Sequence, residues 1–320
     1  MPQMNAWLYS NNTIKLARKA IPTVGEHSVL VKNSAIGLNP VDWKLIAGNL
    51  GHFNENLIPG VDGMGTIIAV GKHVPQLRIN SRVAYHTDLR QDGSYSEYTL
   101  VDGRALIPVP DGISDIAAAA FPCPGLTAWQ AVQKLPQLSG KRILVNGAGG
   151  AVGRIICQLL IALGAKVYAV ASEKHHALLS QIGAVQCVDY HHRHWLDALS
   201  TIRFYAAFDM VNGESAARLA PLLEYYGHLV SIQDRVDKSP LPPFTASISL
   251  HEIALAAQHV YGSDQQWQQL MQAGHHLLQQ IQVGALSLPT IESVSFKQID
   301  KALDNLKNRN DGTKYVALFD

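Results

Sequence analysis

Short runs of β-branched and apolar residues, separated by turn-forming pairs, occupy residues 1–118. The runs lie at 28–32, 66–70, 82–84 and 97–101, with turn-forming pairs such as Pro59-Gly60 and Asp92-Gly93 between them. Runs of this kind bounded by Gly or Pro predict β-strands. An Ala-rich helix is predicted at 116–121, where Pro122 and Pro124 would end it. The N-terminal region is therefore predicted to be rich in β-structure.

From about residue 126 the pattern changes to short apolar strands that alternate with helices of amphipathic spacing. Predicted strands are 142–146, 166–171, 185–188, 206–211 and 228–232, and predicted helices are 152–163, 175–182 and 215–223. Strand–helix–strand repetition implies a doubly wound parallel sheet with helices on both faces. After the Pro-rich segment at 239–243 we expect a helical stretch near 249–282, a strand at 291–296, a helix at 298–307 and a strand at 314–319.

Composition narrows the class of protein. Apolar residues make up 47% of the 320 residues and charged residues only 16%, against about 25% in a typical globular protein. Lys plus Arg number 26 and Asp plus Glu 25, so no basic excess points to nucleic acid. Three cysteines are too few for a disulfide framework. The longest apolar stretch, 155–170, is broken by Gln158 and Lys166. We expect a soluble, cytoplasmic protein that binds neither nucleic acid nor membrane.

A glycine-rich turn at 146–153 stands between a predicted strand and a predicted helix. Gly147, Gly150 and Gly153 recur every three residues, although Val152 stands where the strict G-x-G-x-x-G pattern has its last glycine. Glycines here let the backbone approach a pyrophosphate, which the helix N-terminus then binds. We predict that Gly147, Gly149, Gly150, Ala151 and Val152 bind a dinucleotide; the alternative is an ordinary tight connection.

The end of the second strand of this unit bears on which dinucleotide binds. An NAD site has Asp or Glu about 20 residues after the glycines. Here the strand ends at Ser172, and Glu173 and Lys174 come next. A hydroxyl and a nearby cation suit the 2′-phosphate of NADP. NADP is therefore favoured. NAD stays open, because Glu173 could hold the ribose instead. Lys174 could also be an ordinary solvated residue at the start of a helix.

Several motifs, in order along the whole chain, resemble the medium-chain dehydrogenase/reductase superfamily, and within it the zinc-free quinone oxidoreductase group. They are Ile36-Gly37-Leu38-Asn39-Pro40-Val41-Asp42-Trp43-Lys44, Ile58-Pro59-Gly60-Val61-Asp62, Pro124-Gly125-Leu126-Thr127-Ala128-Trp129, the glycine-rich turn, Val188-Asp189-Tyr190 and Phe208-Asp209-Met210-Val211-Asn212-Gly213. The resemblance implies a β-rich, GroES-like, partly open barrel as catalytic domain (1–120 and 260–320). A Rossmann-type dinucleotide-binding domain (121–259) would interrupt it.

The same resemblance indicates whether the chain can bind a catalytic metal ion. Zinc-dependent members hold their catalytic metal with ligands at positions that look like Asn39, Val61 and Cys123 here. Zinc needs about three protein ligands and an open position, which one thiol cannot supply. We therefore expect no catalytic metal. His191, His192 and His194 fall in a polar connection and are expected to be surface histidines rather than ligands.

The activity that the resemblance implies is hydride transfer from NADPH to a quinone or to an α,β-unsaturated carbonyl. Asn39 would act as a neutral donor near the nicotinamide ribose or the substrate carbonyl, unless it forms an Asx turn before Pro40. Thr127 would contact the nicotinamide end, unless it is a helix N-cap. Tyr190 and Lys174 would flank the 2′-phosphate. The residues expected to line the ribose and nicotinamide are Asn212, Ser231, Ile232 and Gln233.

Weaker expectations concern Asp42 and Lys44, for which an ordinary surface pair is favoured over a polar relay, and His52 as a proton donor. The competing function is a non-catalytic NADPH-binding redox sensor or crystallin-like protein of the same fold.

Low charge and the apolar segment Phe244–Tyr261 predict a homodimer in which two nucleotide domains pair edge to edge, as relatives of this kind do. Ile248 and Ile253 are the side chains expected to face the partner.

Overall fold

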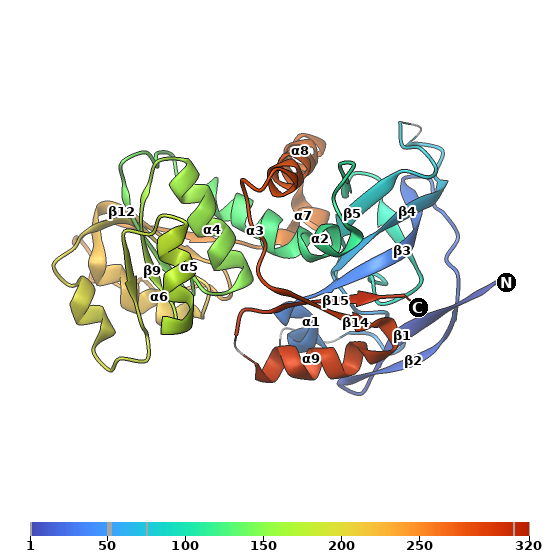
Figure 1. Ribbon diagram of the computed structural model, residues 1–320, viewed down its shortest axis with the longest axis horizontal. Coiled ribbons are helices and arrows are strands. Elements are labelled where there is room, and N and C mark those ends of the chain that lie inside the picture. The colour runs from blue at the N-terminus through green and yellow to red at the C-terminus, as the bar shows by residue number, and fades with distance from the viewer. Residues whose placement is uncertain (1, 50–52, 75, 310, 320) are drawn as a thin grey trace. The chain divides into compact units, whose positions relative to one another are not determined.

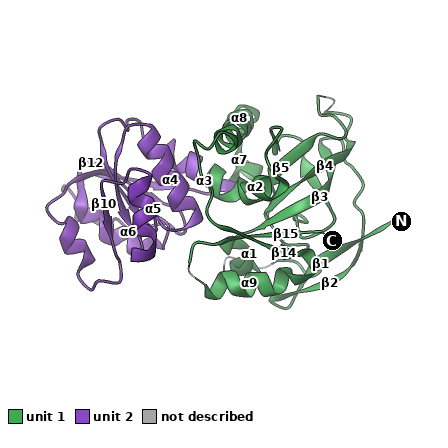
Figure 2. Ribbon diagram, in the orientation of Figure 1, with its two compact units in different colours: residues 1–126, 256–320 green, residues 127–255 purple. Residues whose placement is uncertain are grey.

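The computed structural model describes residues 2–49, 53–74, 76–309 and 311–319. The chain folds as two compact units (Figure 2): unit 1 contains Met1–Leu126 and Ala256–Asp320, and unit 2 contains Thr127–Leu255. The first division falls within helix α3 (Pro122–Val132). Unit 1 is thus assembled from two separate stretches of chain, whereas unit 2 is a single stretch.

Unit 1 is predominantly a sheet structure (Figure 1). Its strands are β1 (Gln3–Ser10), β2 (Thr13–Ala20), β3 (Ser28–Leu38), β4 (Asp62–Val70), β5 (Arg82–His86), β6 (Tyr98–Asp102), β7 (Leu106–Pro108), β14 (Ile291–Ser295) and β15 (Lys314–Leu318). Its helices are α1 (Pro40–Ile46), α2 (Asp115–Ala120), α7 (Gln258–Tyr261), α8 (Asp264–Gln282) and α9 (Ile299–Asn308). The main sheet has the order β14-β15-β3-β4-β5-β7, and β6 pairs with β3.

Strand β3 organises unit 1 because it pairs antiparallel with β4, β6 and β15. Two of these registers bring distant residues together: Tyr315 lies opposite Leu38, and Asp62 lies opposite Gly37. Apolar side chains from both ends of the chain fill the core beside β3. Trp7, Ile36, Tyr95, Phe296 and Tyr315 are among its members. The C-terminal stretch therefore completes the core that the N-terminal stretch begins.

Unit 2 contains an all-parallel sheet with the order β10-β9-β8-β11-β12-β13. Its strands are β8 (Arg142–Asn146), β9 (Lys166–Val170), β10 (Gln186–Val188), β11 (Phe204–Asp209), β12 (Leu223–Ser231) and β13 (Ser249–Glu252). Its helices are α4 (Ala151–Ala162), α5 (His176–Gln181) and α6 (Gly213–Leu219). Every residue of the central strand β11 is buried, as expected of a strand covered on both faces. The predicted parallel α/β sheet is confirmed.

The chain turns to opposite sides of β8, first to β9 and later to β11. In open parallel sheets such a reversal leaves a crevice at the carboxyl ends of the two strands, where ligands bind. The glycine-rich turn comes directly after β8, so it lies at this reversal.

One sequence expectation is wrong, and two elements were missed. The helix predicted at 116–121 does end before Pro122, as α2, but a second helix, α3, begins at Pro122, because proline is tolerated in a first turn, where its missing N–H has no partner to lose. The stretch near 249–282 is not all helix, since β13 comes before α7 and α8. The β1–β2 hairpin was missed, although Asn11 and Asn12 (φ 49° and 59°) form the two-residue turn that such hairpins favour. No helix among the described residues is long and apolar enough to cross a membrane.

Candidate functional site

The glycine-rich turn of unit 2 is shaped by its own backbone. Gly147 adopts φ +85°, and both its N–H and that of Ala148 donate to Val170 O at 3.0 Å. A Cβ on Gly153 would lie 2.3 Å from Gly147 O, so this glycine is required where α4 packs on the turn. A Cβ on Gly149 would lie 2.3 Å from the His175 ring. These three glycines are explained by the packing of the protein itself.

Gly150 is different. A Cβ there would meet nothing closer than Gly147 O at 3.6 Å, an ordinary contact, and Gly150 is the N-cap of α4. The protein's packing therefore does not explain this glycine, while a ligand close to the backbone would. The first residues of α4, Ala151 and Val152, present the N–H groups of a helix N-terminus, which favour a phosphate. The turn thus fits the pyrophosphate of a dinucleotide.

A buried polar network fixes the two strand ends beneath this turn. Asn146 Nδ2, at the end of β8, donates to Asp209 Oδ2 at 2.7 Å and to Ser215 Oγ at 2.9 Å. The Ser215 hydroxyl also donates to Asp209 Oδ2, at 2.8 Å. Asp209 Oδ1 accepts from the N–H groups of Val211 and Asn212 at 2.8 and 3.1 Å. Because each polar group is satisfied, the network holds β8 and β11 in fixed register at the reversal.

The segments after β9 and β10 lie side by side, because Val170 and Val188 pair in parallel register. Glu173 N donates to Asp189 Oδ2 at 3.1 Å across them. The structure therefore brings the segment of Ser172 and Lys174 next to that of Tyr190. Lys174 is exposed, and Tyr190 is 39% exposed with its ring against His191.

The carboxylate of Asp189 joins these two segments. Hydrogen bonds from the His191 N–H, the His191 ring (2.7 Å) and the Glu173 N–H lower its pKa to about 2. The negative charge of Asp189 is therefore stabilised by donors from both segments. His191, His192 and His194 are all exposed, and Glu173 and His192 help line a pocket of about 260 Å³.

The remaining predicted residues of unit 2 fall at or near element ends. Asn212 is the N-cap of α6, and its Oδ1 accepts from Ser215 N at 2.8 Å. Ser231 ends β12 and is buried, and Ile232 N donates to Asp209 O at 2.9 Å, so Ile232 and Gln233 lie beside the end of β11. Thr127 is buried inside α3, six residues into the helix. The N-cap alternative for Thr127 is therefore wrong.

Unit 1 contains a buried cluster of charged and amide groups around Asp62. Asn39 Nδ2 donates to Asp62 Oδ2 at 2.9 Å, and Lys314 Nζ donates to Asn39 Oδ1 at 2.5 Å. Lys314 Nζ lies 3.5 Å from Asp62 Oδ2, and Cys123 N donates to both Asp62 oxygens at 3.0 Å. Asp62 is fully buried, and Lys314 and Asn39 are 3% exposed. The side chain of Asn39 thus belongs to this cluster.

Asp42 lies in the same cluster, so the expectation of a surface pair with Lys44 is wrong. Its Oδ2 accepts from Asn39 N at 2.7 Å and its Oδ1 from Val61 N at 3.2 Å. Burial raises the pKa of Asp42 to about 7. Burial likewise raises the pKa of Asp62 to about 6, although the Lys314 ammonium and the Asn39 amide pull it down. Two carboxyl groups whose pKa values lie near neutral pH therefore lie beside one ammonium group.

The three positions compared with zinc ligands come together in this cluster. Asn39 and Cys123 both bond Asp62, and Val61 precedes it in the chain. A neutral amide and a valine are not zinc ligands, and one thiol leaves two positions unfilled. The cation beside these groups is instead the Lys314 ammonium, 2.5 Å from the Asn39 oxygen. The residues present do not fit a catalytic zinc.

Sequence reasoning missed Lys314, Asp209 and the role of Asp62. A signal existed for the two aspartates, since each comes after an apolar run within a motif of the resemblance. Lys314 gives no local signal, because at the start of a strand it resembles any solvated lysine. His52, the expected proton donor, lies outside the described residues.

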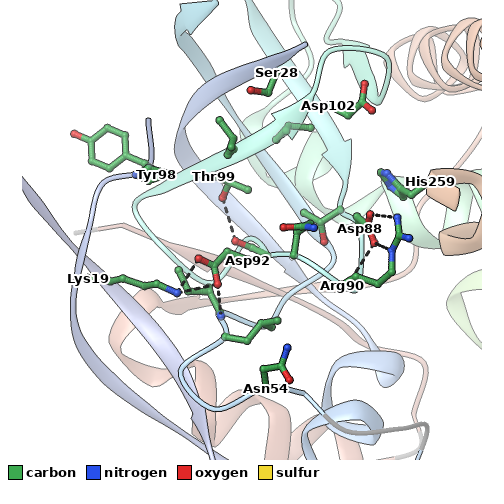
Figure 3. A pocket seen from close by; sticks show the side chains of 18 of the residues that line it. Lys19, Ser28, Asn54, Asp88, Arg90, Asp92, Tyr98, Thr99, Asp102 and His259 are labelled. Atoms are coloured by element: carbon green, nitrogen blue, oxygen red, sulfur yellow. Dashed lines mark hydrogen bonds and ion pairs between the residues drawn. The ribbon is translucent and has the colours of Figure 1, made fainter. Parts of the chain in front are cut away.

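A separate pocket of about 720 Å³ opens in unit 1 (Figure 3). Its lysine and arginine are paired: Lys19 Nζ lies 2.7 Å from Asp92 Oδ2, and Arg90 binds Asp88 at 2.6 Å. His259 and His27 also line it. Because the cations are neutralised within the wall, the pocket does not present a site for an anion.

Two family models match separate parts of the chain, the second of them continuing past Leu255 into unit 1. Residues 25–111 match the family model of the alcohol dehydrogenase GroES-like domain, and residues 151–275 match that of the zinc-binding dehydrogenases. The 2-methylene-furan-3-one reductase of Solanum lycopersicum is 32% identical over 235 residues, 68% of this chain and 60% of that protein. The chloroplastic NADPH-dependent alkenal/one oxidoreductase of Arabidopsis thaliana is 34% identical over 204 residues, 59% of this chain and 53% of that protein. The matched part of the chain thus spans less than two thirds of these curated relatives.

Among solved structures, the quinone oxidoreductase from Coxiella burnetii superposes with a TM-score of 0.84 over 99% of both chains, at 23% identity. This likeness shows the fold. A GroES-like unit together with a parallel dinucleotide-type unit defines a class of nicotinamide-dependent dehydrogenases and reductases. The chain belongs to the medium-chain dehydrogenase/reductase superfamily, in its quinone oxidoreductase-like group. Members of the superfamily bind nicotinamide cofactors.

Proposed function

We propose that this protein is an NADPH-dependent oxidoreductase that reduces a quinone or an α,β-unsaturated carbonyl without a metal. The observation that carries the metal-free part is the Lys314 ammonium, which binds Asn39 where a zinc-dependent relative needs a ligand. The named relatives support the substrate class, since one acts as a furanone reductase and another as an NADPH-dependent alkenal/one oxidoreductase.

The residues of unit 2 bind and orient the cofactor, which supplies the hydride. The N–H groups of Ala151 and Val152 bind the pyrophosphate, and Gly147, Gly149 and Gly150 let it approach. At the far end of the cofactor, Ser172, Lys174 and Tyr190 hold the 2′-phosphate. Towards the nicotinamide, Thr127 contacts the ring end, and Asn212, Ser231, Ile232 and Gln233 line the ribose and the ring.

The preference for NADPH rests on the charges beside β9. The strand is followed by Ser172 rather than by a carboxylate, and Lys174 adds a positive charge nearby. The Asp189 carboxylate is held by hydrogen bonds from His191 and Glu173. A 2′-phosphate carries nearly two negative charges and binds most strongly to charged donors. These features support NADPH over NADH.

On the substrate side, Asn39 is the proposed neutral donor. Its Oδ1 and one amide hydrogen are used by Lys314 and Asp62. The second amide hydrogen makes a long hydrogen bond of 3.4 Å to Gly37 O, which a substrate carbonyl oxygen would displace. Lys314 and Asp62 act as positioning residues, because they fix which atom of the Asn39 amide is the donor.

A panel of quinones and enones, assayed by the loss of NADPH absorbance in the presence of a strong chelator, tests this function. We expect turnover that the chelator does not reduce. Gly150→Val is the matched control, because it blocks the approach of the pyrophosphate at a position where a Cβ meets no protein atom closer than 3.6 Å. Tight NADPH binding without turnover of any acceptor would instead support the non-catalytic redox-sensor or crystallin-like alternative. Activity lost to the chelator would contradict the metal-free mechanism.

A homodimer is proposed as the assembly. Strand β13 is the edge of the parallel sheet, and its outer backbone groups have no strand partner among the described residues. Leu250 on β13 is 45% exposed; Phe244, shortly before β13, and Tyr225 and Tyr226, on the neighbouring strand β12, are exposed as well. Two copies pairing β13 to β13 would satisfy this edge. Ile253 is buried and Ile248 packs on the core of unit 2, so Leu250 replaces them as the proposed contact.

A further inference from the structure

Two histidines and a glutamate meet on the surface of unit 1, away from the residues assigned above. Glu26 and His27 precede β3, and His73 comes shortly after β4. Because Val29 pairs with Val70, the start of β3 and the end of β4 lie together. All three side chains are exposed. Among the residues that the structure describes, no other group of three His, Cys, Asp or Glu side chains gathers its donor atoms this closely.

The backbone holds these residues in place. His73 N donates to Glu26 O, Gly71 N to Ser28 O, and Gly103 N to His27 O, each at 2.9 Å. The two segments approach so closely that a Cβ on Gly71 would lie 2.2 Å from Gly25 O. The side chains therefore project from a cross-linked pair of strand ends rather than from independent loops, which lowers the entropy lost when they bind one ligand.

The donor atoms have the spacing of a tetrahedral metal site. His73 Nδ1 lies 3.2 Å from His27 Nε2 and 3.6 Å from Glu26 Oε2, and all three donors lie within 4.8 Å of one another. Zinc bonds of about 2.0–2.2 Å at tetrahedral angles place ligand atoms roughly 3.3–3.6 Å apart. We propose that Glu26, His27 and His73 form a surface site for Zn²⁺, with water as the fourth ligand.

Lys72 also contacts Glu26 and would affect how tightly this site binds a cation. Its ammonium forms an ion pair with Glu26 Oε1 and leaves Oε2 on the side of His73. One carboxylate oxygen is therefore available to the metal, while the positive charge of Lys72 opposes a second cation nearby. Without a metal, one histidine ring donates a hydrogen bond to the other. The alternative to a zinc site is that Glu26, His27 and His73 form only these surface contacts.

The site is independent of the proposed reaction. None of its residues belongs to the Asp62 cluster or to the cofactor-binding unit. His27 also lines the pocket of Figure 3, so the ion would lie at the edge of that pocket. Loss of zinc should therefore leave NADPH turnover unchanged, and failure of either proposal can be recognised without the other.

The test is a titration of the full chain with ZnCl2 by isothermal titration calorimetry, after dialysis against a chelator and then against buffer alone. We expect binding of one ion per chain that His27→Ala and His73→Ala each weaken at least about tenfold, since even the loss of a residue that only orients a metal ligand costs ten- to a hundredfold. His194→Ala is the matched control, because His194 is also exposed and its Nδ1 lies 3.7 Å from a carboxylate oxygen of Asp197. Lys72→Ala should strengthen binding, because it removes the opposing charge.

Zinc should also raise the melting temperature of the wild type and of His194→Ala but not of His73→Ala, since a ligand of the folded state stabilises it. This second readout shows at the same time that each variant folds. Zinc affinity that is unchanged in both His27→Ala and His73→Ala would overturn the proposal. So would the absence of any one-to-one binding step in the wild type.

Discussion

Replacing Lys314 with methionine should destabilise unit 1 strongly. Lys314 is 3% exposed, and its ammonium is the positive charge 3.5 Å from the fully buried Asp62 carboxylate. Methionine keeps the aliphatic volume and removes the charge. Breaking a buried ion pair by removing one partner costs about 3–5 kcal/mol, because the other charge is left uncompensated. At pH 8, where Asp62 (pKa about 6) is ionised, we expect a loss of this size.

The effect should depend on pH with a definite sign. Asp62 has a folded-state pKa raised above its ordinary value, so its ionisation makes the folded state less stable as pH rises through about 6. Without Lys314 this pKa rises further, and Asp62 remains protonated to higher pH. The difference in free energy of unfolding between wild type and Lys314→Met should therefore be smaller at pH 5 than at pH 8.

The double variant Asp62→Asn/Lys314→Met is the control, because it removes the Asp62 charge together with its cation and leaves only the Asp42 carboxyl, so it should recover at least half of the loss. Hydrogen exchange of peptides from β3 and β15 at both pH values reports the opening free energy of unit 1 separately from unit 2. A cost below about 1 kcal/mol for Lys314→Met at pH 8, well under the expected range, would refute the reasoning. A double variant as unstable as the single one would refute it equally.

Three further predictions concern the cofactor and the assembly. Lys174→Ala should weaken NADPH binding by about 1.5–3 kcal/mol, roughly ten- to a hundredfold, and leave NADH binding nearly unchanged; equal affinity of the wild type for both cofactors would shift attention to Glu173. Gly150→Val should abolish NADPH binding in a protein that still folds, because a Cβ at this position meets no protein atom closer than 3.6 Å; the melting temperature reports what valine costs at the N-cap of α4, and retained binding would contradict the assignment of the turn. Light scattering should give about twice 34.8 kDa for the wild type and a monomer for Leu250→Asp, and a monomeric wild type would exclude the dimer.

The sequence was most informative where structure depends on neighbours in the chain. The strand at 142–146 is β8 to the residue, because an apolar run followed by glycines admits few other conformations. Strand β13 was missed since Ser249-Leu250-His251-Glu252 has no apolar run: as an edge strand it pairs on one side only and needs little burial. The edge strands β10 and β14, whose sequences do contain apolar residues, were predicted.

The candidate site likewise has one part that the local sequence predicts and one part that it does not. The glycine-rich turn can be recognised from eight consecutive residues, whereas the Asp62 cluster depends on long-range register. Tyr315 opposite Leu38 places Lys314 beside Asn39, and Gly37 opposite Asp62 brings in the carboxylate. No property of residues 314–318 alone indicates that they insert between β14 and β3. The Glu26–His27–His73 group was missed for the same reason, since its histidines are far apart in the chain.

That insertion of β15 has a consequence for biosynthesis. Chains emerge from the ribosome N-terminus first, and domains generally fold as units as they appear. Unit 2 is one continuous stretch and has all its strands once residue 255 has emerged. Strand β3, made much earlier, pairs with β6 along residues 28–32, but residues 35–38 on the same edge must wait for residues 314–318 before they are paired and before Asp62 gains its cation. During that interval an apolar strand edge is exposed beside a buried acid, so a chaperone that binds extended apolar segments would protect β3 rather than any strand of unit 2.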